Sequence, residues 1–446
     1  MTAPVSVPLS AGDTAWVLIS SALVMLMVPG LALFYGGLVR GKNTLNTMMM
    51  TLAPLGIVTV QWVVIGYSLA FAPGNGMIGG FAWWGFETVS GAANATYAAT
   101  VPHVAFALFQ AMFACITVSL ISGAVVERMR FSAYLLFGLA WTTLVYDPLA
   151  HWVWGDGGWL RNLGALDFAG GTVVHVSAGT AALVAAVILG RRRVIGRAPL
   201  VPHSVPLTLF GAGLLWFGWF GFNAGSAGSA SDLAATAFAT THAAAAAGLA
   251  TWLLIDIARN GRATAVGLAT GAVVGLVAIT PAAGFVTTRA ALAIGALAAV
   301  ASYAAMQIRA RTSVDVTLDV FACHGVAGIM GAMLTGVFAT KAVNAAGADG
   351  LLAGGGFRQV GVQAVAVLVT VVLSGVLTAG ILLTLRSVMG LRAAIGEEVT
   401  GLDTSEHGEE AYHAGDLGEM GGSAGSLGHG VVLIRPGVGR IERRAS

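Results

Sequence analysis

Apolar stretches of about 20 residues, the length that an α-helix needs to cross a bilayer, recur along the whole chain. Short loops separate them and carry most of the charge. The pattern predicts eleven membrane-spanning helices, at residues 13–37, 44–71, 101–125, 131–152, 170–190, 205–223, 233–257, 264–279, 290–308, 317–339 and 360–385. The eighth of these is short and is closed by Pro281.

The composition supports a membrane protein. Apolar residues make up 57% of the 446 residues and charged residues only 9%, whereas soluble domains carry about 25% charged residues. Intrinsically disordered chains have low hydrophobicity and high charge, so this composition also argues against disorder. The 62 glycines suit helices that pack closely in a bilayer. We therefore expect an all-α polytopic membrane protein, with a transmembrane domain at residues 1–390 and a cytoplasmic, partly disordered region at residues 391–446.

The charges in the loops predict the orientation. Basic residues concentrate in every second loop: Arg40 and Lys42, Arg128 and Arg130, the arginines from Arg191 to Arg197, Arg259 and Arg262, and Arg309 and Arg311. The positive-inside rule places these loops in the cytoplasm. The N-terminus is then outside and the C-terminus is cytoplasmic, in a cell (inner) membrane. No basic segment precedes the first apolar run, so we expect no cleavable signal peptide. The net charge of +2 and the absence of a dense basic block give no indication of nucleic-acid binding.

Two short motifs indicate an internal repeat. The fifth and tenth predicted helices each contain one histidine, His175 and His324, followed four residues later by a glycine and preceded by an aspartate. Helices one to five and six to ten would then be related halves. Since five is odd, the second half would be inverted, as in many transporters, and the eleventh helix would be an addition.

The two histidines are the clearest candidates for chemistry, because ionisable residues inside a span are costly and are often functional. A single intramembrane histidine is also a common interhelical hydrogen-bonding group. Two at equivalent places favour a functional pair. Neutral imidazoles each offer one donor and one acceptor, so they can line an apolar lumen without adding charge.

Aromatic residues cluster near the outer ends of several predicted helices. Phe109 and Phe113 are four residues apart and share a helix face. With the Ser226 hydroxyl, such rings could form a shallow cation cage. Ordinary packing is the competing interpretation for each ring taken alone. The other rings in this group are Trp154, Trp219 and Phe222. Asp167 lies just before the histidine helix, where a helix cap is expected, and its charge would also stabilise a nearby cation.

Signatures of soluble enzymes are absent from the sequence, including nucleotide-binding loops and metalloprotease motifs. The two cysteines, Cys115 and Cys323, lie in apolar runs and form no CxxC pair. We expect no enzymatic activity, no metal and no cofactor.

Taken in order, the motifs resemble the ammonium transporter family (Amt/MEP/Rh), and in particular its bacterial Amt channels. The resemblance rests on residues 34–43 (FYGGLVRGKN), 113–117 (FACIT), 167–175 (DFAGGTVVH) and 218–226 (GWFGFNAGS), on the surroundings of His324, and on residues 401–409 (GLDTSEHGE). It extends to about Tyr412. The glycine-rich end beyond His413 matches nothing in the family pattern.

The resemblance implies a homotrimer in which every protomer has its own narrow hydrophobic pore for ammonium or methylammonium. It implies an outer ammonium site at Phe109, Phe113, Trp154 and Ser226, a gate at Phe113 and Phe222, and a lumen at His175, His324 and Trp219. Asp167 would be the aspartate near the outer site. PII-type signalling proteins would dock at the cytoplasmic tail. The resemblance leaves open whether ammonia or the ammonium ion makes the net passage.

Three other functions compete with an Amt channel. An ammonium sensor would carry an appended signalling domain, for which the tail is short. A haem protein could use His175 and His324 as axial ligands, but the glycines and alanines around His175 leave little room for a macrocycle. A neutral-gas channel of the Rh branch is disfavoured by Trp154 and Ser226.

Overall fold

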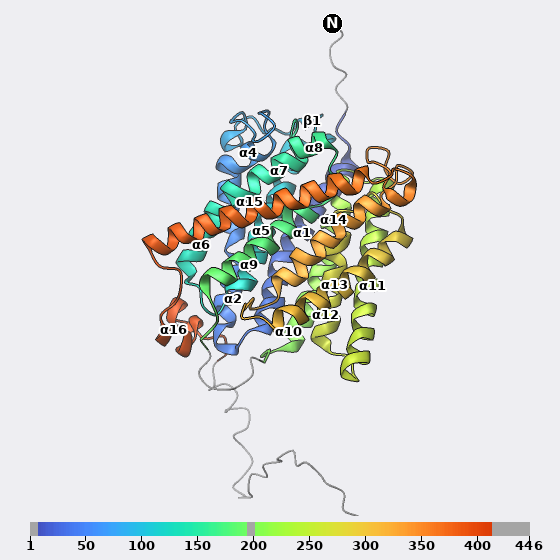
Figure 1. Cartoon of the computed structure of the whole chain (residues 1–446). Coiled ribbons are helices and arrows are strands. Elements are labelled where there is room, and N and C mark those ends of the chain that lie inside the picture. The colour runs from blue at the N-terminus through green and yellow to red at the C-terminus, as the bar shows by residue number, and fades with distance from the viewer. Residues whose placement is uncertain (1–7, 194–200, 413–446) are drawn as a thin grey trace, which may run out of the picture. The chain divides into compact units, whose positions relative to one another are not determined.

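A computed structural model describes residues 8–193 and 201–412 of the chain. Residues up to Ala411 belong to one compact unit, and Tyr412–Ser446 to a second, of which only Tyr412 is described. Arg197, the far tail and the first seven residues therefore lie outside the described part. Helices dominate the first unit and run side by side as a bundle, with α15 crossing its front (Figure 1).

Nine helices in the described residues are long and apolar enough to cross a membrane. Their bounds are α1 (Ala11–Leu38), a broken helix over Gly41–Phe71, α5 (His103–Val125), Gly171–Leu189, α10 (Val205–Gly225), α11 (Asp232–Asn260), α13 (Thr288–Ala310), Phe321–Phe338 and α15 (Arg358–Val388). The predicted polytopic helical protein is thus confirmed. Two further predicted spans are also helical: residues 131–154, whose hydropathy Asp147 and His151 lower, and α12 (Ala265–Ile279), which has 15 residues.

Several of these segments are assembled from shorter pieces. The second consists of η1 (Gly41–Asn43), α2 (Thr44–Leu52), α3 (Pro54–Gln61), the π-helical turn η2 (Trp62–Gly66) and α4 (Tyr67–Phe71). The fourth predicted span, helical at residues 131–154, consists of α6 (Phe131–Trp141), the π-helical turn η4 (Thr142–Tyr146) and α7 (Asp147–Trp154). The π-helical turns η5 (Gly171–Val176) and η6 (Phe321–Val326) lead into α9 (Ser177–Leu189) and α14 (Ala327–Phe338). Single π-turns inside helices often mark functional positions.

Caps explain where several helices begin. The Ser10 hydroxyl accepts a hydrogen bond from the amide of Asp13 at the start of α1 (3.2 Å), and the Thr264 hydroxyl accepts one from Gly267 at the start of α12 (3.0 Å). The expected start at residue 101 is two residues early. Residues Ala98–Pro102 form strand β2, paired antiparallel with β1 (Ala93–Asn94), and α5 begins only at His103.

Loops and short helices complete the described chain. The remaining elements are η3 (Trp84–Phe86), α8 (Trp159–Leu163), η7 (Leu351–Ala353), α16 (Ile395–Thr400) and the π-helical turn η8 (Asp403–His407). Residues 391–407 pack against the loops at one end of the bundle. There the amide of Leu402 donates to Asn43 Oδ1 (2.8 Å), and the Asp403 carboxylate accepts from the amide of Asn46 (2.8 Å).

Candidate transport site

An aromatic vestibule of about 380 Å³ opens at one end of the bundle. The four residues expected at an outer cation site, Phe109, Phe113, Trp154 and Ser226, all line it, and so does Asp167. The structure therefore brings together residues from α5 and α7, from the turn that follows α10, and from the loop that precedes η5. Other rings of the lining were not anticipated from the sequence: Tyr97, Phe106, Phe168 and Phe285.

Hydrogen bonds orient the polar and aromatic groups of this vestibule. Ser226 Oγ donates to the carbonyl of Phe222 (2.8 Å), so its oxygen lone pairs remain available to accept from a bound donor. Trp154 Nε1 donates to the carbonyl of Asp167 (2.8 Å), which fixes the indole. The Phe113 ring meets Trp154 edge-on, with centroids 6.1 Å apart. Such rings attract small cations through their faces.

Phe113, which lines the vestibule, stacks on a second phenylalanine, Phe222. The rings of Phe113 and Phe222 stack with centroids 4.1 Å apart and planes inclined by 20°. Both side chains are buried, Phe113 at 1% and Phe222 at 0% exposure.

The two histidines lie directly beyond the phenylalanine pair. His175 is 6.0 Å from Phe222 between ring centroids, and its Nδ1 lies 3.3 Å from Nδ1 of His324. A shared Nδ1–Nδ1 contact requires one donor and one acceptor, so the two imidazoles have complementary tautomers. His175 Nε2 is buried and has no hydrogen-bond partner in the described chain. It is free to contact a small solute.

Trp219 supports the first histidine from the side. Its ring stacks on His175 at 5.4 Å with an interplanar angle of 22°. Trp219 Nε1 donates to Thr280 Oγ1 (3.0 Å), and that hydroxyl donates to the carbonyl of Leu276 (2.8 Å). Thr280 was not singled out from the sequence, since a lone threonine at the end of an apolar run carries no distinctive signal.

Glycines allow the two histidine helices to cross in contact. A Cβ atom on Gly179 would lie 2.3 Å from the amide nitrogen of Gly325, next to His324. A Cβ atom on Gly328 would lie 3.0 Å from the carbonyl of Gly171 and 3.1 Å from Cβ of His175. The glycine four residues after each histidine thus packs on the segment that carries the other histidine.

Asp167 caps the first histidine helix. Its Oδ1 accepts from the amides of Gly170 (2.8 Å) and Gly171 (2.6 Å), and its Oδ2 from those of Thr172 (2.8 Å) and Val173 (3.2 Å). The Thr172 hydroxyl also donates to Oδ2. These contacts satisfy amides that have no partner within the helix. Asp319, upstream of the second histidine, differs, since it pairs with Arg309 at 2.5 Å.

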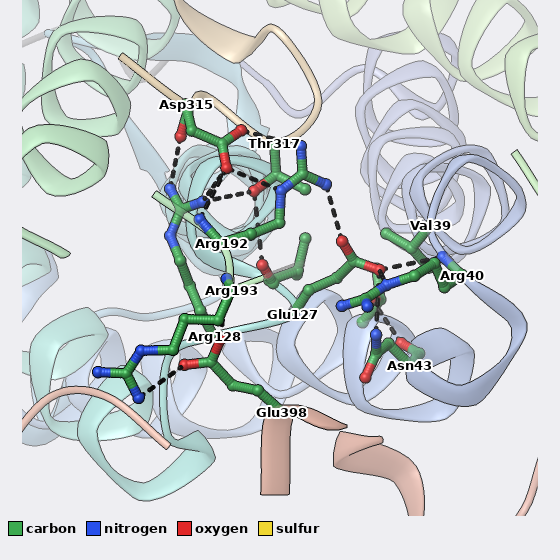
Figure 2. A network of polar contacts seen from close by, with 12 residues as sticks. Val39, Arg40, Asn43, Glu127, Arg128, Arg192, Arg193, Asp315, Thr317 and Glu398 are labelled. Atoms are coloured by element: carbon green, nitrogen blue, oxygen red, sulfur yellow. Dashed lines mark hydrogen bonds and ion pairs between the residues drawn. The ribbon is translucent and has the colours of Figure 1, made fainter. Parts of the chain in front are cut away.

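A charged network lies where the basic loops meet (Figure 2). The buried Glu127 accepts from Arg40 (2.8 Å), Asn43 (3.0 Å) and Arg192 (2.7 Å). Burial opposes ionisation of this carboxyl, but the charges of Arg40 and Arg192 and their hydrogen bonds hold the pKa of Glu127 below its usual value. These pairings between distant loops could not be predicted from the sequence.

Asp315 extends the network to the loop before η6. It binds Arg192 at 2.8 Å and Arg128 at 3.2 Å. Burial alone would raise the pKa of Asp315, but hydrogen bonds from Arg192 and the charges of Arg192 and Arg128 lower it to about 2. Glu398, in the tail, binds Arg392 and contacts Arg193. The network therefore holds the arginine-rich loops and the tail segment together as ion pairs.

Comparison with known proteins identifies the family. The sequence model of the Ammonium Transporter Family matches residues 15–412. The chain belongs to the ammonium transporter family. It is 48% identical over 402 residues to an ammonium transporter of Bacillus subtilis (strain 168), a match that covers 90% of this chain and 98% of that protein. Its function is the transport of ammonium across a membrane.

Solved structures agree with this assignment. The crystal structure of Saccharomyces cerevisiae Mep2 matches with a TM-score of 0.81 and 37% identity, over 87% of this chain and 88% of that chain. A sensor Amt protein matches with a TM-score of 0.80 and 29% identity, over 89% of this chain and 98% of that chain. The helical architecture of this ammonium transporter is therefore shared with proteins whose structures are known.

Proposed function

We propose that ammonium enters at the aromatic vestibule, is dehydrated at the Phe113–Phe222 pair, and crosses as ammonia past His175 and His324. The observation that supports this route is the order in which the vestibule, the phenylalanine pair and the histidine pair contact one another. The aromatic vestibule is lined by Phe113, whose ring stacks on Phe222, and Phe222 in turn contacts His175. Nε2 of His175 has no hydrogen-bond partner in the described chain. Phe109, Trp154 and Ser226 hold the ion at the outer site. Trp219 fixes the orientation of His175.

Deprotonation explains selectivity in this route. Moving a bare cation into a low-dielectric passage costs tens of kcal/mol in the Born limit. Ammonium avoids most of that cost by leaving its proton behind, whereas a metal ion cannot. The same passage therefore admits ammonium and methylammonium and excludes potassium. The proton either returns to the outer side or crosses separately by way of the histidines, which would make transport electrogenic.

The architecture we propose has eleven spans arranged as two inverted five-helix halves plus α15. The reciprocal packing of Gly179 and Gly328 supports the two-fold relation between the histidine helices. The gathering of Arg40, Arg128 and Arg192 in one ion-pair network (Figure 2) supports a cytoplasmic location for the loops that carry them. The N-terminus would then be outside. We further propose a homotrimer in the cell membrane, with residues 391–446 as a cytoplasmic region that a PII-type protein can bind.

Electrophysiology on protein reconstituted in liposomes tests the route. Pulses of ammonium should evoke transport that His175→Ala or His324→Ala changes in rate or selectivity while the protein stays folded. Thr270→Val serves as a matched control, because the Thr270 hydroxyl only donates to the carbonyl of Val266 within α12. Transport at wild-type rate and selectivity in both alanine variants would refute the role of the histidine pair.

A second substitution tests dehydration as the selectivity filter. His175→Asp or His175→Glu places a fixed anion where a metal ion could be stabilised. A potassium current should then appear that the wild-type protein lacks. A folded variant that passes no potassium would contradict the mechanism. A sensor role, favoured by the likeness to a sensor Amt protein, would be indicated instead if ammonium altered the binding of a PII-type protein while evoking no transport.

A further inference from the structure

A second buried carboxyl lies inside the helix bundle, away from the route described above. Asp147 is the first residue of α7, immediately after the π-helical turn η4, and its exposure is 0%. It has one hydrogen-bond donor in the described chain, since its Oδ2 accepts from Nε2 of Gln61 at 2.7 Å. Gln61 is the last residue of α3, immediately before the π-helical turn η2. The contact therefore joins two spans where each departs from α-helical geometry.

The hydrogen bonds of Gln61 fix the direction of its amide. Nε2 donates to Asp147 and to Thr143 Oγ1 (3.1 Å), and the Thr143 hydroxyl donates in turn to the carbonyl of Leu139 (3.0 Å). Both amide hydrogens are thus used. Two buried acceptors remain without a partner in the described chain, Gln61 Oε1 and Asp147 Oδ1. They belong to the two groups that the 2.7 Å bond already joins.

Comparison with Asp167 indicates the charge state of Asp147. The Asp167 carboxylate accepts five hydrogen bonds, as expected for an ionised group away from bulk water. Asp147 accepts one. His151 lies one turn further along α7, where its Nδ1 is 3.0 Å from the carbonyl of Ala70 and its Nε2 is 2.7 Å from the carbonyl of Asn75, and neither nitrogen forms a hydrogen bond with Asp147. A buried carboxylate without compensation is strongly unfavourable and takes up a proton instead.

We propose that Asp147 is a neutral carboxylic acid that pairs with the side-chain amide of Gln61. A single proton on Oδ1 turns one of the two unpaired acceptors into a donor, and Gln61 Oε1 is the acceptor it needs. The pair then forms two antiparallel hydrogen bonds, N–H to carboxyl oxygen and O–H to amide oxygen. No buried acceptor of either group remains unsatisfied.

This pair acts on transport through the position of Trp154. Trp154 follows Asp147 by seven residues on α7, which places the two on the same helix face about two turns apart. Fixing Asp147 to the neighbouring span thus fixes the rotation and height of the helix end that carries the outer-site indole. Asp147 is a positioning residue for that site, and it acts as an uncharged one.

Asp147→Asn is the decisive variant, because asparagine has a similar shape, can present one donor and one acceptor to Gln61, and cannot carry a negative charge. In reconstituted full-length protein we expect methylammonium half-saturation and the unfolding midpoint to stay close to wild type. Asp147→Leu and Gln61→Leu remove the pair, and we expect them to raise half-saturation several-fold with a smaller change in maximal rate. An Asp147→Asn protein that behaves like Asp147→Leu would show that the negative charge matters, and would overturn the proposal.

Infrared spectroscopy provides a readout that does not depend on transport. The C=O stretch of a protonated carboxylic acid should be present in the wild-type protein at neutral pH and should disappear in Asp147→Asn. Its absence from the wild type overturns the neutral acid even if the leucine variants fail to fold. The positioning role rests on the proposed outer site, so Trp154→Leu is measured alongside. If that variant leaves half-saturation unchanged, the outer site and the positioning role fall, while the infrared band still decides the protonation of Asp147.

Discussion

Replacing Asp167 by asparagine should destabilise the transporter and lower its activity together. Asparagine has one acceptor oxygen where aspartate has two, and its amino group would face backbone N–H donors. If the oxygen keeps Gly170 and Gly171, then Thr172 and Val173 lose their acceptor, and the reverse orientation loses the other two. A buried donor left unpaired costs about 1–3 kcal/mol. Two such donors amount to roughly 2–6 kcal/mol, a large part of the 5–15 kcal/mol typical of a folded protein.

Asp256→Asn provides the matched control, because Asp256, near the end of α11, also accepts hydrogen bonds from the start of α12 and does not line the vestibule. Its Oδ2 accepts from the amide of Thr264 at 3.3 Å and from the Thr264 hydroxyl at 2.6 Å, both of which one amide oxygen can still accept. Its Oδ1 accepts only from the side-chain amide of the exposed Asn260, at 3.4 Å. The assays are the unfolding midpoint in detergent and the ammonium-evoked current in liposomes. Asp167→Asn should unfold at a clearly lower temperature than Asp256→Asn and carry less current. If Asp167→Asn unfolds like the wild type and carries full current, the reasoning is wrong.

Four further substitutions test other parts of the molecule. Ser226→Ala and Trp154→Leu each remove about 1 kcal/mol of ion binding, so half-saturation for ammonium should rise several-fold, and unchanged values in both would mean that the ion is selected deeper. The pKa of Glu127 lies below the usual value of a glutamate, so its ionisation stabilises the folded protein at neutral pH. That contribution is lost as the pH falls below the usual glutamate range, about 4.3, and Glu127→Gln should flatten the acid dependence of the unfolding midpoint. Thr280→Val leaves the Trp219 N–H unpaired and should slow transport, whereas Thr270→Val should not.

The spans of the fold were predictable because a bilayer imposes its own constraint on the sequence. Every backbone N–H and C=O group must be hydrogen-bonded within the segment, so a long apolar run predicts a helix. Local signals failed at the ends of helices. Val101 and Pro102 continue an apolar run, but they pair with residues 93–94 as a strand, and pairing across a turn is not visible in hydropathy. The π-helical turns, such as that at His175, were likewise not predictable from composition.

The residues of the candidate site were predictable only where they lie in a recognisable sequence motif. The rings, the histidines and Asp167 lie in segments with recognisable patterns, whereas Thr280 and the partners of Glu127 depend on contacts between distant parts of the chain. Asp147 could have been found, since an ionisable residue within a predicted span is costly by default. The two histidines drew attention instead because they recur in two similar motifs. A single buried carboxyl offers no such repetition.

In the proposed route, capture and selection belong to different layers of the protein. Trp154 and Ser226 are only partly buried, and the faces of aromatic rings attract any small cation. The vestibule therefore raises the local concentration of cations but does not discriminate between ammonium and potassium. Below it, exposure falls to 1% at Phe113, 0% at Phe222 and 1% at His175. In such a passage the cost of a charge far exceeds any difference in binding at the vestibule. Discrimination between ammonium and potassium therefore follows from which ion can shed its charge before it passes the phenylalanine pair, and the polar nitrogen of His175 beyond that pair is placed to receive the neutral product.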